Sequence, residues 1–370
     1  MILHLLMDEK VSSRAVKLFE ECNAHGNIFI VFNSKIKKWS FVNKAYNILS
    51  CHSPEVKHID WKSIDKVIIH YLDLPKMKFV LTHPLNEKTI IWMMWGGDIY
   101  NEYLNKLGFQ LYSSNNSCLH IDKFGNLSFK YLRKLKYSLL SPYCFLLQKW
   151  FMKNKIDYIV TSDVELELIK KYIVFKRLKS NLQFSYYPIE DVLGELKECH
   201  AEGNKIIVGN SYSFSNNHEY VLEQIRNLDL SSYEIVVPLN YGMNEEYKNI
   251  VSEKYRAVLN ATILDEFLPL DEYNRLMLQT CTYIYGNFRQ EAWGNILIGL
   301  YLGSKIYLPK ENPLWEQCKR YGFVVFALEN IQSTFSDMLS DHDKEQNRMT
   351  ALSLFSANKN KEYIQSICKL

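Results

Sequence analysis

Several features are scarce in this 370-residue chain, and each absence excludes a class of protein. The eight cysteines are far apart and form no Cys-x-x-Cys pair, which argues against a zinc site or a dithiol redox motif. No run of about 18 apolar residues occurs, so no membrane-spanning helix is predicted. The apolar start, residues 1–7, lacks a basic segment, so we expect a buried strand there rather than a secretory signal. A net charge of +3 is too small to indicate nucleic acid binding.

The chain is long enough for two domains, since domains average about 150 residues. Short, continuously apolar runs alternate with helix-period segments along most of it. This pattern is typical of parallel strands covered by helices on both faces. We therefore expect an α/β fold with two doubly wound parallel sheets. The predicted boundaries are 1–188 for the first domain, 189–204 for a charged linker, 205–345 for the second domain and 346–370 for a terminal helix.

A polar turn follows the predicted strand at residues 205–208. It contains Gly209, Asn210 and Ser211, and a helix is predicted to begin near Asn217. Small residues after a strand let backbone N–H groups approach a ligand, and a helix start favours negative charge. The pattern indicates either a diphosphate-binding turn or a tight turn with an ordinary helix cap.

A second polar loop, after the strand predicted at 282–285, contains Arg289 and Gln290. Gly294 and Asn295 begin the next predicted helix. Arg289 could pair with a phosphate, and Gln290 or Glu291 could accept from sugar hydroxyls; alternatively Arg289 forms an ordinary salt bridge. Ligands of open α/β sheets bind beyond the carboxyl ends of strands, so two such loops in one sheet strengthen each other.

Asp98 follows the apolar run at 90–95 through Gly96 and Gly97. A carboxylate at the end of a buried strand could act as a general base. The same position also suits the N-cap of a helix beginning at Ile99, and spacing alone favours the cap.

Basic and aromatic residues alternate between residues 123 and 155, where no acidic residue occurs. This composition suits either a surface that rests on anionic lipid headgroups or a helix with a solvated basic face. The basic residues singled out for the lipid surface are Lys130, Arg133, Lys134 and Lys136.

One sequence resembles a metal motif. Asp341-His342-Asp343 has the Asp-x-Asp spacing, but it lies in a polar connector, so we predict a helix start and no metal.

Taken in order, the motifs from residue 92 to residue 315 resemble a known family, the TDP-4-acetamido-4,6-dideoxygalactose:lipid II transferases of enterobacterial common antigen synthesis, also called 4-α-L-fucosyltransferases. The matching segments are Trp92-x-x-Trp95-Gly-x-Asp98-x-Tyr100, Gly209-Asn-Ser211, Ser215-Asn-Asn-His218, Val237-Pro238 with Tyr241, Ile263-Leu-x-Glu266, Asp271-x-Tyr273, Arg289-Gln290, Gly294 and Glu311-Asn-Pro-x-Trp315.

The resemblance implies a GT-B fold, in which two Rossmann-like domains face a cleft and the last helix crosses back to the first domain. It also implies a glycosyltransferase without metal or cofactor that uses a nucleotide-sugar donor, dTDP-linked by preference. The acceptor would be a saccharide on undecaprenyl diphosphate, at the cytoplasmic face of the bacterial inner membrane, where the enzyme would be peripheral.

Roles follow from the same resemblance. The second domain would bind the donor, with Glu266 holding ribose or sugar hydroxyls and Arg289 neutralising the diphosphate. The first domain would bind the acceptor near Trp95 and Gly97, with Asp98 as general base or, in a retaining reaction, as an orienting group.

Two departures from the family pattern, Glu291-Ala-Trp293 and the Gly96-Gly97 pair, suggest another surface polysaccharide, such as an O-antigen or a capsule. A GT-B-fold nucleotide-sugar epimerase and a noncatalytic partner of a polysaccharide assembly complex are the alternative functions.

Overall fold

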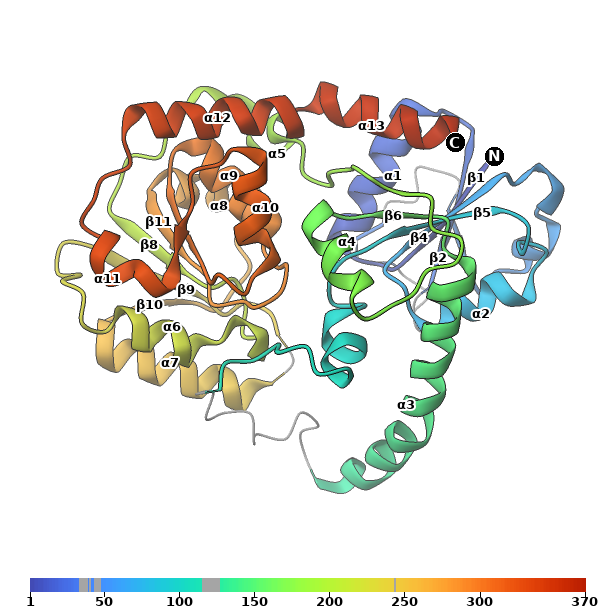
Figure 1. Ribbon diagram of the computed structural model, residues 1–370, viewed down its shortest axis with the longest axis horizontal. Coiled ribbons are helices and arrows are strands. Elements are labelled where there is room, and N and C mark those ends of the chain that lie inside the picture. The colour runs from blue at the N-terminus through green and yellow to red at the C-terminus, as the bar shows by residue number, and fades with distance from the viewer. Residues whose placement is uncertain (33–38, 40, 43–47, 115–126, 243) are drawn as a thin grey trace. The chain divides into compact units, whose positions relative to one another are not determined.

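The structure of the chain is a computed structural model (Figure 1). It describes residues 1–32, 39, 41, 42, 48–114, 127–242 and 244–370; for residues 102 and 127–140 it describes the backbone alone. The chain divides into two compact units. The first comprises Met1–Phe109, Lys136–Pro188 and Ala357–Leu370, and the second comprises Gln110–Leu135 and Ile189–Ser356.

The first unit is built on a seven-stranded parallel sheet with the order β3-β2-β1-β4-β5-β6-β7. Its strands are β1 (Ile2–Leu6), β2 (Asn27–Val31), β3 (Ile48–Ser50), β4 (Lys66–His70), β5 (Thr89–Met93), β6 (Tyr158–Val160) and β7 (Ser180–Leu182). Its helices are α1 (Lys10–Cys22), α2 (Leu74–Thr82), α4 (Asp163–Lys170) and α13 (Ala357–Lys369), together with a π-helix at Tyr100–Leu104. The long helix α3 spans Leu127–Lys155.

The second unit contains a six-stranded parallel sheet with the order β10-β9-β8-β11-β12-β13. The strands are β8 (Lys205–Val208), β9 (Glu234–Pro238), β10 (Thr262–Leu264), β11 (Thr280–Ile284), β12 (Lys305–Leu308) and β13 (Phe326–Ala327). The helices are α5 (Ile189–Leu193), α6 (His218–Ile225), α7 (Glu245–Leu259), α8 (Leu270–Leu278), α9 (Trp293–Leu302), α10 (Pro313–Tyr321), α11 (Ile331–Thr334) and α12 (Asp341–Phe355).

Continuous apolar strands account for both sheets. Every residue of β1, β2 and β12 is buried, as a parallel sheet covered on both faces requires. The predicted pair of doubly wound sheets is therefore confirmed. In each sheet the strand order reverses beside the first strand, between β1 and β4 and between β8 and β11. Ligands of such sheets bind at this reversal, outside the carboxyl ends of the strands.

Residues 189–204, which we expected to be a linker, belong to the second unit. Ile189, Val192 and Leu193 of α5 are buried, and Asn274 Nδ2 donates to the Val192 carbonyl at 2.8 Å. The last part of the chain forms two helices. The second of them, α13, contributes Ile364 and Ile367 to the apolar core of the first unit, where it packs on α1.

In the part of the chain that the structure describes, no helix is both long enough and apolar enough to cross a membrane. The cysteines described form no disulfide with one another; they are Cys22, Cys51, Cys144, Cys199, Cys281, Cys318 and Cys368.

A row of hydrogen-bonded polar side chains crosses the core of the first unit. Trp95 Nε1 lies 2.8 Å from the Tyr186 hydroxyl, which lies 2.9 Å from His70 Nδ1. His70 Nε2 lies 3.2 Å from His4 Nδ1, and His4 Nε2 lies 3.2 Å from Asn27 Oδ1. Both histidines are fully buried, so each polar group in the row needs its neighbour.

The residues at the two ends of this row determine which group donates in each of its hydrogen bonds. At one end, Trp95 can only donate, so the Tyr186 oxygen accepts from it. At the other, Asn27 Nδ2 donates to the Phe19 and Asn23 carbonyls, which turns Oδ1 toward His4. His4 therefore carries its proton on Nε2, His70 carries its proton on Nε2, and Tyr186 donates to His70. Both imidazoles are neutral in this arrangement.

Acid should weaken the first unit through these histidines. Burial lowers the pKa of His4 to about 3 and the pKa of His70 well below its ordinary value. Because the unfolded chain binds protons near pH 6.5 and the folded chain does not, each histidine makes stability fall as pH drops below about 6.5. In urea unfolding from pH 7 to pH 5, the wild type should lose about 1 kcal/mol more per pH unit below pH 6 than a His4→Gln variant. Parallel slopes for the two proteins would show that His4 is protonated in the folded state.

Candidate active site

The turn after β8 is closed by its own side chains. Gly209 has a φ of +70°, and a Cβ added there would lie 2.9 Å from Asn216 Oδ1 and 3.1 Å from His218 Nε2. The Asn210 N–H donates to Asn216 Oδ1 at 2.9 Å, and Asn216 Nδ2 donates to Ser211 Oγ at 3.0 Å. Glycine is required at 209 both for its backbone conformation and for the close approach of these side chains.

Glu291 joins this turn to the loop after β11. Its Oε2 accepts from Ser215 Oγ at 2.8 Å and Asn287 Nδ2 at 2.8 Å, and it pairs with Arg289 Nη2 at 2.9 Å. Its Oε1 lies 3.4 Å from Asn216 Nδ2. We expected Glu291 or Gln290 to accept from ligand hydroxyls, but the Glu291 carboxylate is occupied by donors of the protein. Its role as the junction of two loops was missed.

Arg289 is buried and already ion-paired in this state. Besides the contact with Glu291, its Nη1 donates to the Gln290 carbonyl at 3.0 Å, while Nε is buried and has no hydrogen-bond partner in the part of the chain that the structure describes. From the sequence, Arg289 was expected either to bind a phosphate or to form an ordinary salt bridge. The structure shows the salt bridge. A phosphate could bind Nε, or it could take over the Nη2 contact from Glu291.

Unsatisfied polar atoms gather around these loops. Asn210 Oδ1, Asn287 Oδ1, Arg289 Nε and His218 Nε2 are buried and have no hydrogen-bond partner among the described residues. A buried polar atom left unpaired costs about 1–3 kcal/mol, and native proteins contain few of them. Three of the four belong to the loops at the reversal of the sheet, where a polar ligand is expected to bind.

The helix start after β11 adds partial positive charge. Ala292, with a φ of +59°, precedes α9, and Gly294 and Asn295 lie in its first turn. The exposed backbone N–H groups of such a turn suit an anionic ligand.

Two other residues that were predicted to bind the nucleotide-sugar donor lie in different surroundings. Asn217 is fully buried: its Nδ2 donates to the Gly286 carbonyl at 2.8 Å, and its Oδ1 accepts from the Ser113 N–H at 3.0 Å. Asn217 therefore links the start of α6 to the loop after β11 and to Ser113. Glu266 follows β10, which β9 separates from β8, and its carbonyl accepts from Asn240 Nδ2. The structure does not place Glu266 in the cluster formed around Glu291.

In the first unit, Asp98 holds the loops after β4 and β5. Its Oδ2 accepts from the Leu72 N–H at 2.9 Å and Trp92 Nε1 at 2.8 Å, and its Oδ1 accepts from the Trp95 N–H at 3.1 Å. It does not cap a helix, because Ile99 precedes the π-helix at Tyr100–Leu104. Burial raises the pKa of Asp98, and these hydrogen bonds oppose the rise. The observed contacts position a loop; a role as general base stays a prediction.

Trp95 and Gly97 lie on that same loop. The Trp95 ring is half-buried and contacts Tyr71 edge-on, with 5.7 Å between ring centroids. A Cβ at Gly97 would contact the Tyr71 ring at 3.4 Å. These residues form a small aromatic corner at the carboxyl ends of β4 and β5. The side chains of Lys130, Arg133, Lys134 and Lys136 lie outside the described residues, although their backbone is part of α3.

The other predicted features are more easily placed. Asp341 and Asp343 form the first turn of α12, where Ser340 Oγ accepts from the Asp343 N–H, so the predicted helix start is confirmed. Over the described ranges, no three His, Cys, Asp or Glu side chains are grouped to hold a metal ion.

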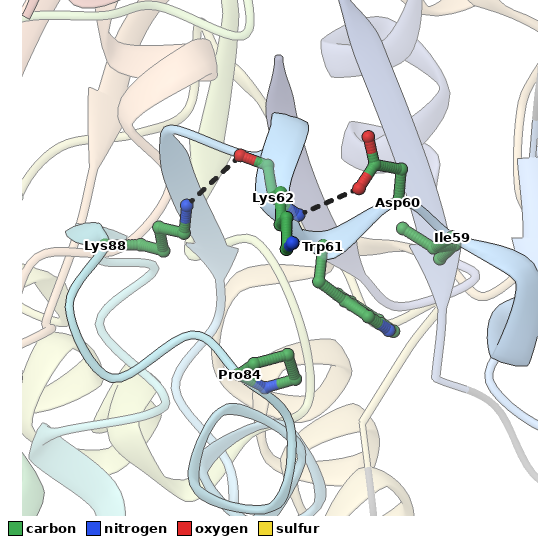
Figure 2. Close-up of a pocket in the computed structure, with 6 residues that line it drawn as sticks. All are labelled: Ile59, Asp60, Trp61, Lys62, Pro84 and Lys88. Carbon is green, nitrogen blue, oxygen red and sulfur yellow. Dashed lines mark hydrogen bonds between the residues drawn. The ribbon is translucent and has the colours of Figure 1, made fainter.

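A pocket of about 500 Å³ lies elsewhere in the first unit (Figure 2). Its lining residues are Ile59, Asp60, Trp61, Lys62, Pro84 and Lys88. They precede β4 and β5 in the chain, so the pocket is at the amino ends of these strands. Ligands of such sheets bind at the opposite edge, and this pocket is therefore not the candidate active site.

Comparison with known proteins identifies both family and fold. Residues 115–369 match the family model described as 4-alpha-L-fucosyltransferase, glycosyl transferase group 56. Among solved structures, the chain is similar to a glycosyltransferase from Rickettsia africae ESF-5, with a TM-score of 0.62 and 15% identity over 100% of this chain and 97% of that one.

Two further structures have the same architecture. Sucrose-phosphate synthase from Thermosynechococcus elongatus has a TM-score of 0.67 at 10% identity, covering 100% of this chain and 98% of that one. Anabaena HepE, solved with UDP and glucose, has a TM-score of 0.58 at 8% identity over 100% of both chains. At these identities the likeness establishes the fold alone, and the predicted GT-B type is confirmed.

The contacts of Asp98 predict a stability defect for Asp98→Asn. The new amide would turn its NH₂ group toward either the Trp95 N–H or the Leu72 and Trp92 donors, so at least one buried donor would lose its acceptor. We expect unfolding by urea to show a loss of about 1–3 kcal/mol. Asp60→Asn, at an exposed cap in the same unit, serves as the control. An Asp98→Asn protein as stable as the wild type but inactive would instead identify a general base.

Proposed function

This chain belongs to the 4-alpha-L-fucosyltransferase family, glycosyl transferase group 56, and is a nucleotide-sugar-dependent glycosyltransferase; from that premise we propose the following reaction. The enzyme transfers a deoxyamino-sugar, such as 4-acetamido-4,6-dideoxygalactose, from a dTDP-linked donor. The acceptor is a saccharide carried on undecaprenyl diphosphate, at the cytoplasmic face of the bacterial inner membrane, and the product enters a surface polysaccharide.

The observation that supports a donor site most strongly is the junction of two loops at the reversal of the second sheet. The turn at Gly209 and the loop at Arg289 follow β8 and β11, which are neighbours in the sheet, and Glu291 holds them together. Arg289 Nε, a buried donor with no hydrogen-bond partner among the described residues, and the start of α9 suit a diphosphate, whereas Asn210 Oδ1 and Asn287 Oδ1 can accept from hydroxyl groups. Anabaena HepE, of the same fold, was solved with UDP.

In the proposed reaction, the bond between the anomeric carbon of the donor sugar and the diphosphate oxygen breaks. A new bond forms from that carbon to an acceptor hydroxyl oxygen, whose proton passes to a general base, the role predicted for Asp98, and the nucleoside diphosphate leaves with the bonding electrons. Arg289 and the N–H groups of the α9 start stabilise the negative charge that develops on the leaving diphosphate. In the first unit, Trp95 and Gly97 contact the acceptor.

Part of α3 supports the proposed membrane contact. Tyr143, Leu146 and Trp150 are exposed, at 48%, 63% and 45% of their full areas. Their spacing of three and four residues puts them on one helix face. Lys155 Nζ lies 5.8 Å from the Trp150 ring and Lys78 Nζ lies 5.3 Å from the Tyr143 ring. Exposed apolar rings beside lysines suit an interface with anionic lipid headgroups.

A nucleotide-sugar donor should stabilise the folded protein. In a thermal unfolding screen of dTDP-, UDP- and GDP-sugars, we expect the dTDP-sugar to give the largest rise. At a concentration of 100 Kd the stabilisation would be about 2.7 kcal/mol. Arg289→Gln should remove most of the rise, since it deletes the cation at the diphosphate, whereas Arg256→Gln, at the end of α7, should not. The donor proposal fails if none of the three nucleotides stabilises the wild type.

Flotation with vesicles tests the lipid surface. The wild type should float with vesicles that contain anionic lipid, because each basic residue near such a surface contributes about 1 kcal/mol. Two variants should remain at the bottom of the gradient: Leu146→Glu with Trp150→Glu, and the quadruple change of Lys130, Arg133, Lys134 and Lys136 to Glu. Met338→Glu with Met349→Glu, two exposed positions of the second unit, is the charge-matched control for the double variant. Equal flotation of all four proteins would contradict the proposal.

A further inference from the structure

Two exposed aromatic rings lie side by side at the carboxyl edge of the second sheet. Tyr241 follows β9 and Phe267 follows β10, and these strands are neighbours. The ring planes differ by 9° and the centroids are 6.1 Å apart. The residues are 44% and 55% exposed, although aromatic side chains of this size are usually largely covered.

The turn after β8 forms hydrogen bonds with both the hydroxyl and the backbone carbonyl of Tyr241. Asn210 Nδ2 donates to the Tyr241 hydroxyl at 2.5 Å, and the Tyr212 N–H donates to the Tyr241 carbonyl at 2.9 Å. The backbone beside it is also constrained, because a Cβ at Gly242 would lie 2.4 Å from the Tyr212 ring. Tyr241 is therefore fixed relative to the residues proposed to bind the diphosphate.

Phe267 is held next to Tyr241 by its own loop. The Leu239 N–H donates to the Leu264 carbonyl at 2.7 Å, and Asn240 Nδ2 donates to the Glu266 carbonyl at 3.4 Å. These bonds join the residues after β9 to the end of β10 and to the loop that follows it, and hold the backbone segments that carry the two rings next to each other. Little rotational freedom would be lost if a flat ligand stacked on them.

From this geometry we infer that Tyr241 and Phe267 form a stacking platform for the nucleobase of the donor, a role that rests on the proposed function. Adjacent strands are about 4.8 Å apart, so β10 lies about 10 Å from β8. This separation is comparable to the length of the ribose and diphosphate that connect a base to the turn at Gly209. An aromatic platform accepts any base, because every base has a π-face.

The spacing of the rings determines how the base binds. Insertion between two rings requires two carbon–carbon contact distances, about 7 Å in total, which exceeds the 6.1 Å observed. The base therefore stacks on an outer face of the pair.

Calorimetric binding of dTDP, UDP and inorganic pyrophosphate tests the platform. Tyr241→Leu and Phe267→Leu remove an aromatic ring but keep an apolar side chain. The variant that lacks the ring contacted by the base should weaken nucleoside diphosphate binding about tenfold, since stacking on an aromatic ring contributes about 1–3 kcal/mol per base. The other variant removes only the neighbour of that ring and should weaken binding less. Pyrophosphate has no base, and its affinity should stay at the wild-type value. Phe267→Tyr should bind nucleotides normally, as should Val258→Ala, a similarly exposed apolar position of the same unit.

The outcomes separate the platform from the donor proposal. Leu variants that bind dTDP and UDP like the wild type would overturn the platform and leave the donor site intact. An equal loss of pyrophosphate and nucleotide affinity would also overturn it, because the rings would then act through the diphosphate turn. Absence of nucleotide binding in the wild type would overturn the proposed donor itself.

Discussion

The candidate donor site depends on one carboxylate, that of Glu291. Parallel strands end in loops whose backbone groups have no ladder partners, so side chains must fix the loops to one another. Glu291 does this by taking donors from Ser215 on one loop and from Asn287 and Arg289 on the other. A group with several buried donors cannot be neutralised or shortened without leaving some of them unpaired. The positions of Gly209 and Arg289 relative to each other therefore follow from it.

Asp98 plays the same part in the first sheet. It takes donors from Leu72, which follows β4, and from Trp92 and Trp95 at the end of β5. In both units a carboxylate that is largely covered by the protein joins the loops of two neighbouring strands at the carboxyl edge. This shared arrangement explains why a carboxylate follows a glycine turn at position 98, a pattern that by itself suggests a catalytic base. The row from Trp95 to Asn27 then fixes the indole of the same loop from within the core.

The fold was predictable where burial alone determines the structure. Continuous apolar runs predict β1, β4, β5, β8 and β12, because a strand covered on both faces is apolar at most of its positions. The short strands β3 and β7 were not predicted, since their residues are half-buried or exposed and show no such run. Gly209 was predictable from its place after a strand. The roles of Glu291, Tyr186 and Tyr241 were not, because each has a partner that is distant in sequence, and a local pattern contains no information on such pairs.

In the proposed reaction, the ion pair of Arg289 and Glu291 acts in catalysis as well as in the structure. A buried pair contributes little net stability, because its attraction is offset by desolvation, but it fixes the guanidinium in place. A diphosphate beside it competes with Glu291 for the same cation. As the sugar bond breaks, charge accumulates on the leaving oxygens, and the attraction of Arg289 for them grows while its attraction for Glu291 does not. An interaction that strengthens only along the reaction lowers the barrier more than it tightens donor binding.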